Sequence, residues 1–116
     1  MKIHRLEDVP THAMTMEGAK NVSKQVPISK DDGAPHFSFR VFTVAPEGHT
    51  PFHQHAWEHL NYIIAGEGTL VLDQGEEQPI RQGDFILVDP NEKHCYRNLS
   101  TDTPLVLICA VPAEHE

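Results

Sequence analysis

Residues 46–59 read PEGHTPFHQHAWEH, and this stretch holds four of the nine histidines of the 116-residue chain. Proline and glycine precede His53-Gln54-His55, and these residue types punctuate the chain ahead of a strand. Residues two apart in a strand point to the same side, so the rings of His53 and His55 can converge on one ion. His59 has the same parity and lies just inside the next strand candidate. We therefore expect these three imidazoles to share one side of the molecule.

A fourth histidine, His94, lies far along the chain, where a strand candidate follows a turn rich in proline and asparagine. If its strand neighbours the first stretch, the four side chains form an open metal site, and neutral imidazole suits zinc, copper, iron and nickel. A purely structural His-x-His pair and a histidine-rich surface tract are the alternatives, although such tracts usually lack the surrounding glycines and prolines. The remaining histidines are expected to be ordinary exposed residues: His4, His12, His36, His49 and His115.

Short strands are predicted along the whole chain, because nine prolines and seven glycines interrupt it and leave few windows for a helix. The segments between them are rich in β-branched and aromatic residues, which is typical of a sandwich or barrel. The predicted strands cover residues 22–28, 37–44, 57–64, 69–72, 85–88, 94–98 and 105–111. Residues 14–20 fit either a turn of helix or a strand added to an edge. The fold class is therefore expected to be all-β.

Composition limits the classes of protein to which this chain can belong. Its length fits one domain, and 39% hydrophobic residues are enough for a modest core. A formal net charge of −8 argues against a nucleic-acid partner, which needs a clustered basic face. No apolar run approaches the ~20 residues of a membrane helix, so no membrane partner is expected. Two cysteines, Cys95 and Cys109, are too few for a secreted disulfide scaffold, which favours a cytoplasmic location.

The stretch 46–59 resembles the first sequence motif of the cupin family, which runs from a glycine-rich turn through His-x-His to a glutamate and a closing glycine. Gly66 falls at the position of that closing glycine. Glu47 stands where the motif has the first of two glycines. The larger departure is His59, which stands where the family normally has glutamate.

The second cupin motif, a glycine, a Pro-x-Gly turn, a histidine and an asparagine, fits the residues from Gly83 to Asn98. Asn91 replaces the turn glycine, and asparagine tolerates a left-handed conformation better than most residues. His94 and Asn98 keep the spacing of the family. The resemblance implies one cupin domain over 1–116, a β-barrel of the double-stranded β-helix (jelly-roll) type. Residues 1–36 would form an N-terminal arm or strands, and residues 37–111 the barrel core.

More closely, the chain resembles the compact four-histidine cupins, some of which bind manganese and come from thermophilic bacteria. The resemblance implies one divalent metal ion held by His53, His55, His59 and His94, with manganese favoured. Ligand softness instead favours nickel, copper or zinc, and iron suits other cupins. Glu58 is the alternative ligand, because a β-bulge just before it would reverse its direction.

The pocket beside the metal is predicted from strand parity. The candidate substrate-binding residues are Arg40, Asn61, Tyr96, Leu107 and Cys109. Arg40 is a charge in an otherwise apolar strand, and a buried arginine normally needs a partner. It is expected either to orient an anionic substrate or to pair with Glu58 or Asp84.

The resemblance makes a metal-dependent oxidoreductase the first functional hypothesis, a dioxygenase or peroxide-using enzyme that acts on a small organic molecule. A non-catalytic module that binds or senses a metal or ligand is the second hypothesis, and a metal-dependent isomerase or lyase is the third. A homodimer is also expected, because Leu60, Tyr62 and Ile64 would leave an apolar outer face in need of cover.

Overall fold

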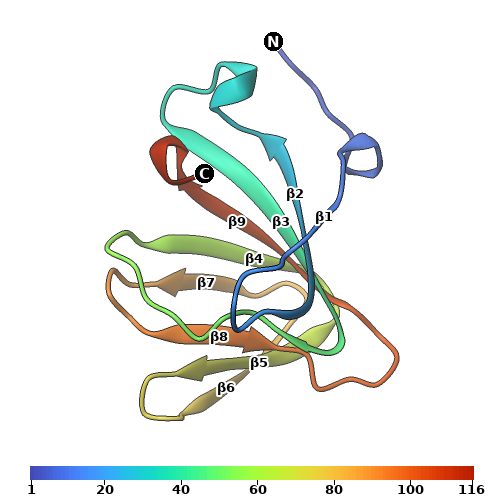
Figure 1. Cartoon of the computed structure of the whole chain (residues 1–116), viewed down its shortest axis with the longest axis vertical. Coiled ribbons are helices and arrows are strands. Elements are labelled where there is room, and N and C mark those ends of the chain that lie inside the picture. Colours follow the sequence, from blue (N-terminus) through green and yellow to red (C-terminus); the bar gives the residue numbers. More distant parts are fainter.

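The structure, a computed structural model, describes residues 1–116 and contains nine strands, three short 3-10 helices and no α-helix (Figure 1). This confirms the all-β prediction. The strands are β1 (His12–Ala13), β2 (Lys20–Ile28), β3 (Phe37–His49), β4 (His59–Ala65), β5 (Glu67–Leu72), β6 (Glu77–Arg81), β7 (Phe85–Val88), β8 (His94–Arg97) and β9 (Leu105–Pro112). The 3-10 helices are η1 (Leu6–Asp8), η2 (Lys30–Asp32) and η3 (Ala113–His115).

All strands belong to one curled sheet with the order β6-β5-β8-β3-β9-β4-β7, and β1 and β2 join it at β3. The curl depends on β3, whose 13 residues make it the longest strand. Residues 37–44 pair with β9, whereas His49, at the other end of β3, pairs with Arg97 of β8. Because β3 contributes to both layers, β8, β5 and β6 fold back to face β3, β9 and β4 across an interior (Figure 1).

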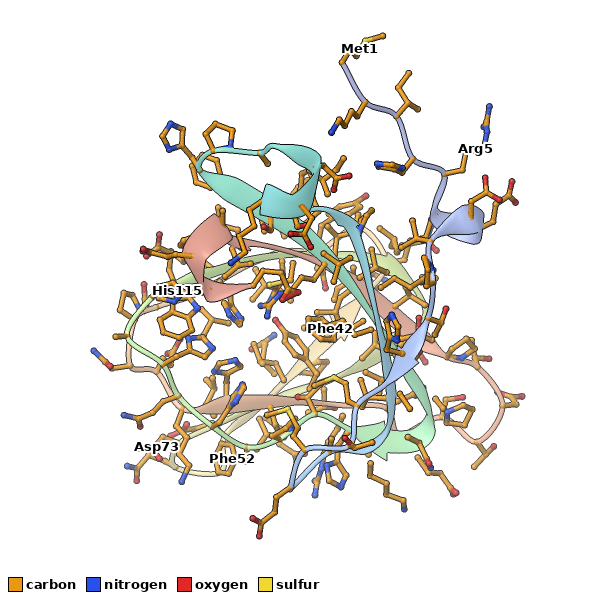
Figure 2. All side chains as sticks on the ribbon, turned by 45° about the horizontal axis from the view of Figure 1, so that its top comes forward. Met1, Arg5, Phe42, Phe52, Asp73 and His115 are labelled. Carbon is orange, nitrogen blue, oxygen red and sulfur yellow. The ribbon has the colours of Figure 1, made fainter.

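The interior is filled by alternate residues of these strands, as period-2 patterning predicts. In β9 every second residue is buried, and Leu105 and Leu107 are almost completely enclosed. Val44 and Ile63, from β3 and β4, lie in the same cluster, and Tyr96 of β8 packs against them from the facing layer. The sticks in Figure 2 show this interior, with Phe42 near its centre. The core therefore lies between the two layers of the curled sheet.

The strand boundaries depart from the sequence predictions at several points; β3, for example, continues to His49 where the prediction ended at residue 44. The strand predicted over residues 57–64 begins only at His59, because the chain bends at 56–57. Strand β6 was not predicted, since its sequence EQPIR is polar and contains a proline; it pairs only with β5, and proline is tolerated at such an edge. In the ambiguous segment 14–20 the chain makes a turn, and the edge strand is β1 just before it.

Two residues that replace glycine in the cupin motifs adopt the left-handed backbone conformation that glycine favours. Asn91 has a φ of 65°, which confirms the left-handed turn expected from its replacement of glycine. Glu47 also has a φ of 65°. An L-residue in this region costs roughly 1 kcal/mol, so the fold holds Glu47 in place against a local preference.

Two glycines offer a matched test of close backbone approach. Gly66 and Gly75 have nearly the same φ, 81° and 82°. A Cβ on Gly66 would lie 2.2 Å from the carbonyl oxygen of Pro104, whereas nothing lies within 4 Å of a Cβ on Gly75. Gly75→Ala is expected to cost about 1 kcal/mol from its backbone conformation alone. Gly66→Ala is expected to cost at least about 2 kcal/mol more, because the backbone must move. Urea unfolding of both variants checks this, and equal costs would contradict it.

Candidate metal centre

The loop between β3 and β4 carries two of the predicted ligands and is fastened to β8, which carries a third. His53 and His94 exchange both backbone hydrogen bonds, at 3.1 and 2.9 Å, in an isolated β-bridge. The amide of Asn91 donates to the carbonyl oxygen of His55 at 2.7 Å. The amide of Thr50 donates to the carbonyl oxygen of Tyr96 at 2.9 Å, and the amide of Tyr96 donates to the side-chain Oγ1 of Thr50 at 2.8 Å. These bonds set the register that brings distant parts of the chain to one place.

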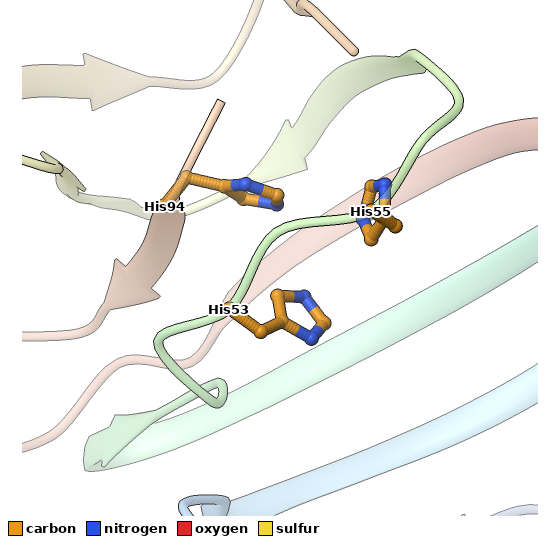
Figure 3. A group of neighbouring side chains, drawn as sticks. All are labelled: His53, His55 and His94. Carbon is orange, nitrogen blue, oxygen red and sulfur yellow. The ribbon is translucent and has the colours of Figure 1, made fainter. Parts of the chain in front are cut away.

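The rings of His53, His55 and His94 face a common point, as Figure 3 shows. One ring nitrogen from each lies within 4.8 Å of the others, and the ring centroids are 5.2 to 5.4 Å apart. Three imidazole nitrogens at this spacing can bind one divalent ion with little movement. His53 and His55 lie in a loop and not in the strand that the parity argument assumed, yet their rings share one side, and the expected neighbourhood of His94 is present in the fold.

Hydrogen bonds orient two of these rings for metal binding. The Nδ1 of His55 donates to the carbonyl oxygen of Trp57 at 2.9 Å, and the Nδ1 of His94 donates to that of Glu92 at 2.8 Å. In the neutral form of each ring, this bond places the proton on Nδ1 and leaves Nε2 free to bind a metal. The Nε2 of His55 is buried and has no hydrogen-bond partner. An unsatisfied buried acceptor is costly, so this orphaned nitrogen fits a metal ligand.

His59 adjoins the three-histidine cluster but makes a different contact. Its ring centroid is 4.0 Å from that of His55, while its Nε2 accepts a hydrogen bond from Nη2 of Arg40 at 3.2 Å. His59 is buried and Glu58 is exposed, in agreement with the preference for His59 over Glu58. A role for His59 as fourth ligand stays a prediction.

A cavity of about 170 Å³ opens beside the cluster and is lined in part by His53, His59 and His94. All five residues predicted from parity for the pocket line it as well: Arg40, Asn61, Tyr96, Leu107 and Cys109. Their part in substrate binding stays a prediction.

A model of the cupin domain family matches residues 40–111, more than half of the chain. The chain belongs to the cupin family. This agrees with the two histidine motifs and with the curled sheet.

Several relatives of this cupin have a described activity. The polyketide cyclase RemF from Streptomyces resistomycificus is 32% identical, with a TM-score of 0.91 over 97% of this chain and 80% of that one. The L-ectoine synthase of Mycolicibacterium gilvum is 31% identical over 88 residues, 75% of this chain. The cupin spans only 56% to 64% of the lengths of the L-ectoine synthases it matches. An oxalate-binding protein of Thermotoga maritima is 28% identical over 84% of this chain and 83% of its own.

Arg40 has a different environment from either of its predicted pairings with a carboxylate. Neither Glu58 nor Asp84 lies within ion-pair distance, so the structural alternative is wrong. The guanidinium instead donates from Nη2 to the Sγ of Cys109 at 3.1 Å as well as to His59, and its buried Nε has no partner. An arginine with unused donors in a cavity is suited to an anionic ligand.

Tyr96 and Asn61 form a buried pair in the cavity wall, where Tyr96 also packs against the apolar core. The Nδ2 of Asn61 donates to the hydroxyl oxygen of Tyr96, which leaves the hydroxyl proton available for another acceptor. Burial raises the pKa of Tyr96 well above its ordinary value, so the hydroxyl stays protonated at neutral pH. Asn61 Oδ1 is buried and has no partner. The pair thus presents one donor and one acceptor to the cavity.

Sequence reasoning missed several residues around the site, because they come from distant segments. Met14, Met16 and Lys24 line the cavity from the N-terminal part of this cupin. His115 was expected to be an ordinary exposed residue, which is wrong. Its ring stacks on that of Trp57, with centroids 3.6 Å apart and an interplanar angle of 5°. Trp57 in turn stacks on His55, at 4.8 Å and 14°.

The electrostatics of the site keep His53, His59 and His94 neutral. Burial, reinforced by neighbouring histidines and Arg40, lowers the pKa of His53 to about 4 and that of His59 to about 3. Burial also lowers the pKa of His94. Neutral imidazole is the form that binds a metal, so these three side chains need no deprotonation at pH 7. As a separate finding, the helices of this cupin are three-residue 3-10 turns, and none could span a membrane.

The metal-free protein is therefore expected to lose stability as the pH falls from 6.5 to 4. In the unfolded chain these histidines take up protons near pH 6.5, whereas His53 and His59 in the folded protein resist protonation down to about pH 4 and 3. The unfolded state binds more protons in this window, so the buried His59 alone weakens folding by up to about 1.4 kcal/mol per pH unit. Urea unfolding at pH 7, 6 and 5 measures the slope. His59→Gln should flatten it, and a flat profile in the unmodified protein would refute the prediction.

Proposed function

We propose that this cupin is a metal-dependent enzyme that acts on a small organic molecule without consuming an oxidant, in a cyclisation or another isomerase- or lyase-type reaction. The observation that carries the metal part is the orphaned Nε2 of His55 beside His53 and His94. The reaction class is supported by the similarity to the polyketide cyclase RemF, at 32% identity and a TM-score of 0.91.

The metal would be held by His53, His55 and His94, with His59 as a fourth ligand once Arg40 releases it. A divalent ion there would act as a Lewis acid that polarises a carbonyl oxygen. Manganese is favoured by the resemblance to the four-histidine cupins, while an all-imidazole set also suits iron, nickel, copper and zinc. Metal analysis of protein produced under metal-limited conditions, followed by titration with each ion, tests the choice.

The other cavity residues bind and orient the substrate in this proposal. Arg40 holds an anionic or carbonyl oxygen through its unused donors. The hydroxyl of Tyr96 keeps its proton at neutral pH and can donate it to a developing negative charge. Asn61 fixes that hydroxyl and offers its Oδ1 to a donor on the substrate. Leu107 and Cys109 form the apolar wall.

An oxidoreductase of the dioxygenase- or peroxide-using type is the second candidate. Four protein ligands on an octahedral ion leave two positions, enough for a substrate and an oxygen species side by side. The two candidates differ in oxygen demand. Metal-loaded protein is incubated with a panel of small carbonyl and carboxylate compounds under air and under argon, with an oxygen electrode and mass spectrometry as readouts. Conversion under argon supports the non-oxidative reaction; conversion only with oxygen uptake supports the oxidoreductase.

A non-catalytic ligand binder is the third candidate, and the similarity to the Thermotoga maritima oxalate-binding protein supports it. It predicts stoichiometric binding of oxalate to the metal-loaded protein with no product.

We also propose a cytoplasmic location, which the two free cysteines of the structure support.

A homodimer completes the proposal. Strands β3, β4, β7 and β9 carry an apolar outer groove of about 480 Å³. Leu60, Phe85 and Leu87 in this groove are 54%, 83% and 57% exposed. A contiguous apolar patch of this kind is unusual on a surface that stays in contact with water. A second copy of this face would cover it. Light scattering should give twice the 13.0 kDa chain mass, and Phe85→Asp should return the monomer. A monomer in the unmodified protein would contradict the dimer.

A further inference from the structure

The charges that line the cavity are opposite to those of the molecule as a whole. The chain carries 17 acidic and 9 basic residues, apart from its histidines. The cavity lining nevertheless contains Lys24 and Arg40 and no aspartate or glutamate. A bound divalent metal would add further positive charge. A cavity of this charge in an acidic protein selects an anionic ligand.

One carboxylate does contact Lys24, and it comes from the chain itself. The side chain of Glu116 is only 13% exposed and lies 3.2 Å from Nζ of Lys24 through Oε1, with Oε2 at 3.4 Å. The two residues are 92 positions apart in the sequence. The carboxylate also lies close enough to Cys109, on the cavity wall, to contribute to the raised pKa of that thiol. Glu116 thus contacts Lys24, a residue of the cavity lining.

The carboxylate of Glu116 is only partly hydrogen-bonded. Oε1 of Glu116 lies near the ammonium nitrogen but accepts no hydrogen bond, although it is buried. The amide of Ala113 donates to the carbonyl oxygen of His36, and the amide of Glu116 donates only locally, to the carbonyl oxygen of Ala113 at 3.3 Å. The contacts of this segment with the rest of the barrel beyond Ala113 include the side chains of His115, on Trp57, and Glu116, on Lys24. A ligand with a better-placed anionic group can therefore replace Glu116 without breaking the barrel. Figure 2 shows His115 at the edge of the molecule, beside other aromatic rings.

We propose that Lys24 binds an anionic group of the substrate, and that Glu116 occupies this position in the ligand-free protein. The proposal rests on the proposed function, since it concerns the same cavity, and it narrows the substrate class. The substrate would carry a carboxylate or similar anion at the end away from the metal. Glu116 would then compete with the ligand, and its removal should strengthen binding.

The test measures the dissociation constants of oxalate, succinate and glutarate, which differ in the separation of two carboxylates, by calorimetry on manganese-loaded protein. For the probe that binds best, Glu116→Gln should bind it at least about fivefold more tightly. In this variant no carboxylate occupies Lys24 before the probe arrives, so a larger fraction of the protein is ready to bind. Lys24→Gln should bind at least about fivefold more weakly. In the Lys24→Gln background, Glu116→Gln should not change the dissociation constant further, since the ammonium group for which Glu116 and the probe compete is gone.

Two control variants remove the same charges outside the cavity. Glu114→Gln lies in the same segment with a side chain 80% exposed, and Lys20→Gln lies at the exposed start of β2. Both should leave the constants within about twofold. The proposal is overturned if Glu116→Gln binds no more tightly, if Lys24→Gln binds like the unmodified protein, or if no probe binds to Glu116→Gln. Metal content is measured in each sample: a chain that retains no metal refutes the proposed metal centre, and the variant series on that metal-free protein still decides the role of Lys24.

Discussion

His55→Ala is expected to reduce the affinity for manganese or zinc by more than about 100-fold, since second-shell changes alone cost 10- to 100-fold. The substitution removes one of three imidazoles whose nitrogens lie within 4.8 Å of one another. It also removes the buried nitrogen that has no other partner. Metal titration with a competing chelator measures the affinity, and the loss of activity should follow the loss of metal.

The fold should survive this substitution, because the loop keeps its backbone bonds. The carbonyl oxygen of His55 still accepts from Asn91, and the bridge between His53 and His94 is unchanged. Circular dichroism verifies this. His36→Ala is the matched control, an exposed histidine outside the cluster, and should bind metal as before. Unchanged metal affinity in folded His55→Ala would show that the cluster is not the binding site.

Asn98→Ala is expected to destabilise the protein by about 4 kcal/mol, within the range for a broken buried hydrogen-bond network. Asn98 is 1% exposed. Its Nδ2 donates to the carbonyl oxygens of Val44 and Thr103 at 2.9 and 2.8 Å, and its Oδ1 accepts from the amide of Ser100 at 3.0 Å. Alanine would leave these backbone groups without partners where β3 meets the connection from β8 to β9.

Urea unfolding of the metal-free protein measures this loss. Gln74→Ala removes an amide from an exposed turn and should change stability by less than about 0.5 kcal/mol. If Asn98→Ala proves as mild as Gln74→Ala, the amide is not what fastens the two layers. Asn98 follows His94 in the second cupin motif. The prediction therefore assigns different roles to the two residues of that motif: His94 binds the metal, and Asn98 stabilises the fold.

Much of the site was predictable from local rules. The close spacing of His53 and His55, and the left-handed turn at Asn91 ahead of His94, depend on a few neighbouring residues and are visible in the chain. Asn61 and Tyr96 follow from strand parity, Arg40 from its charge in an apolar strand, and all five predicted pocket residues line the cavity. Strand β6 was not predictable in this way, because a polar edge strand with Pro79 takes its structure from pairing with β5.

The partners of these side chains depend on contacts that no local pattern encodes. Arg40 is a visible anomaly in a strand, yet its contacts with His59 and Cys109 depend on the β3–β9 register and the curl of the sheet. The stack of His115 on Trp57 joins residues from opposite halves of the chain.

The chain alone was sufficient for the strand class, the two histidine motifs and the residues of one polar cavity, because period-2 alternation and turn chemistry act over a few residues. The tertiary structure was needed to show that three imidazole nitrogens meet within 4.8 Å, with that of His55 buried and unpartnered. It was also needed to bring Lys24 and Glu116 together over the same cavity. Such long-range contacts are set by how the sheet closes on itself, which is a property of all nine strands together.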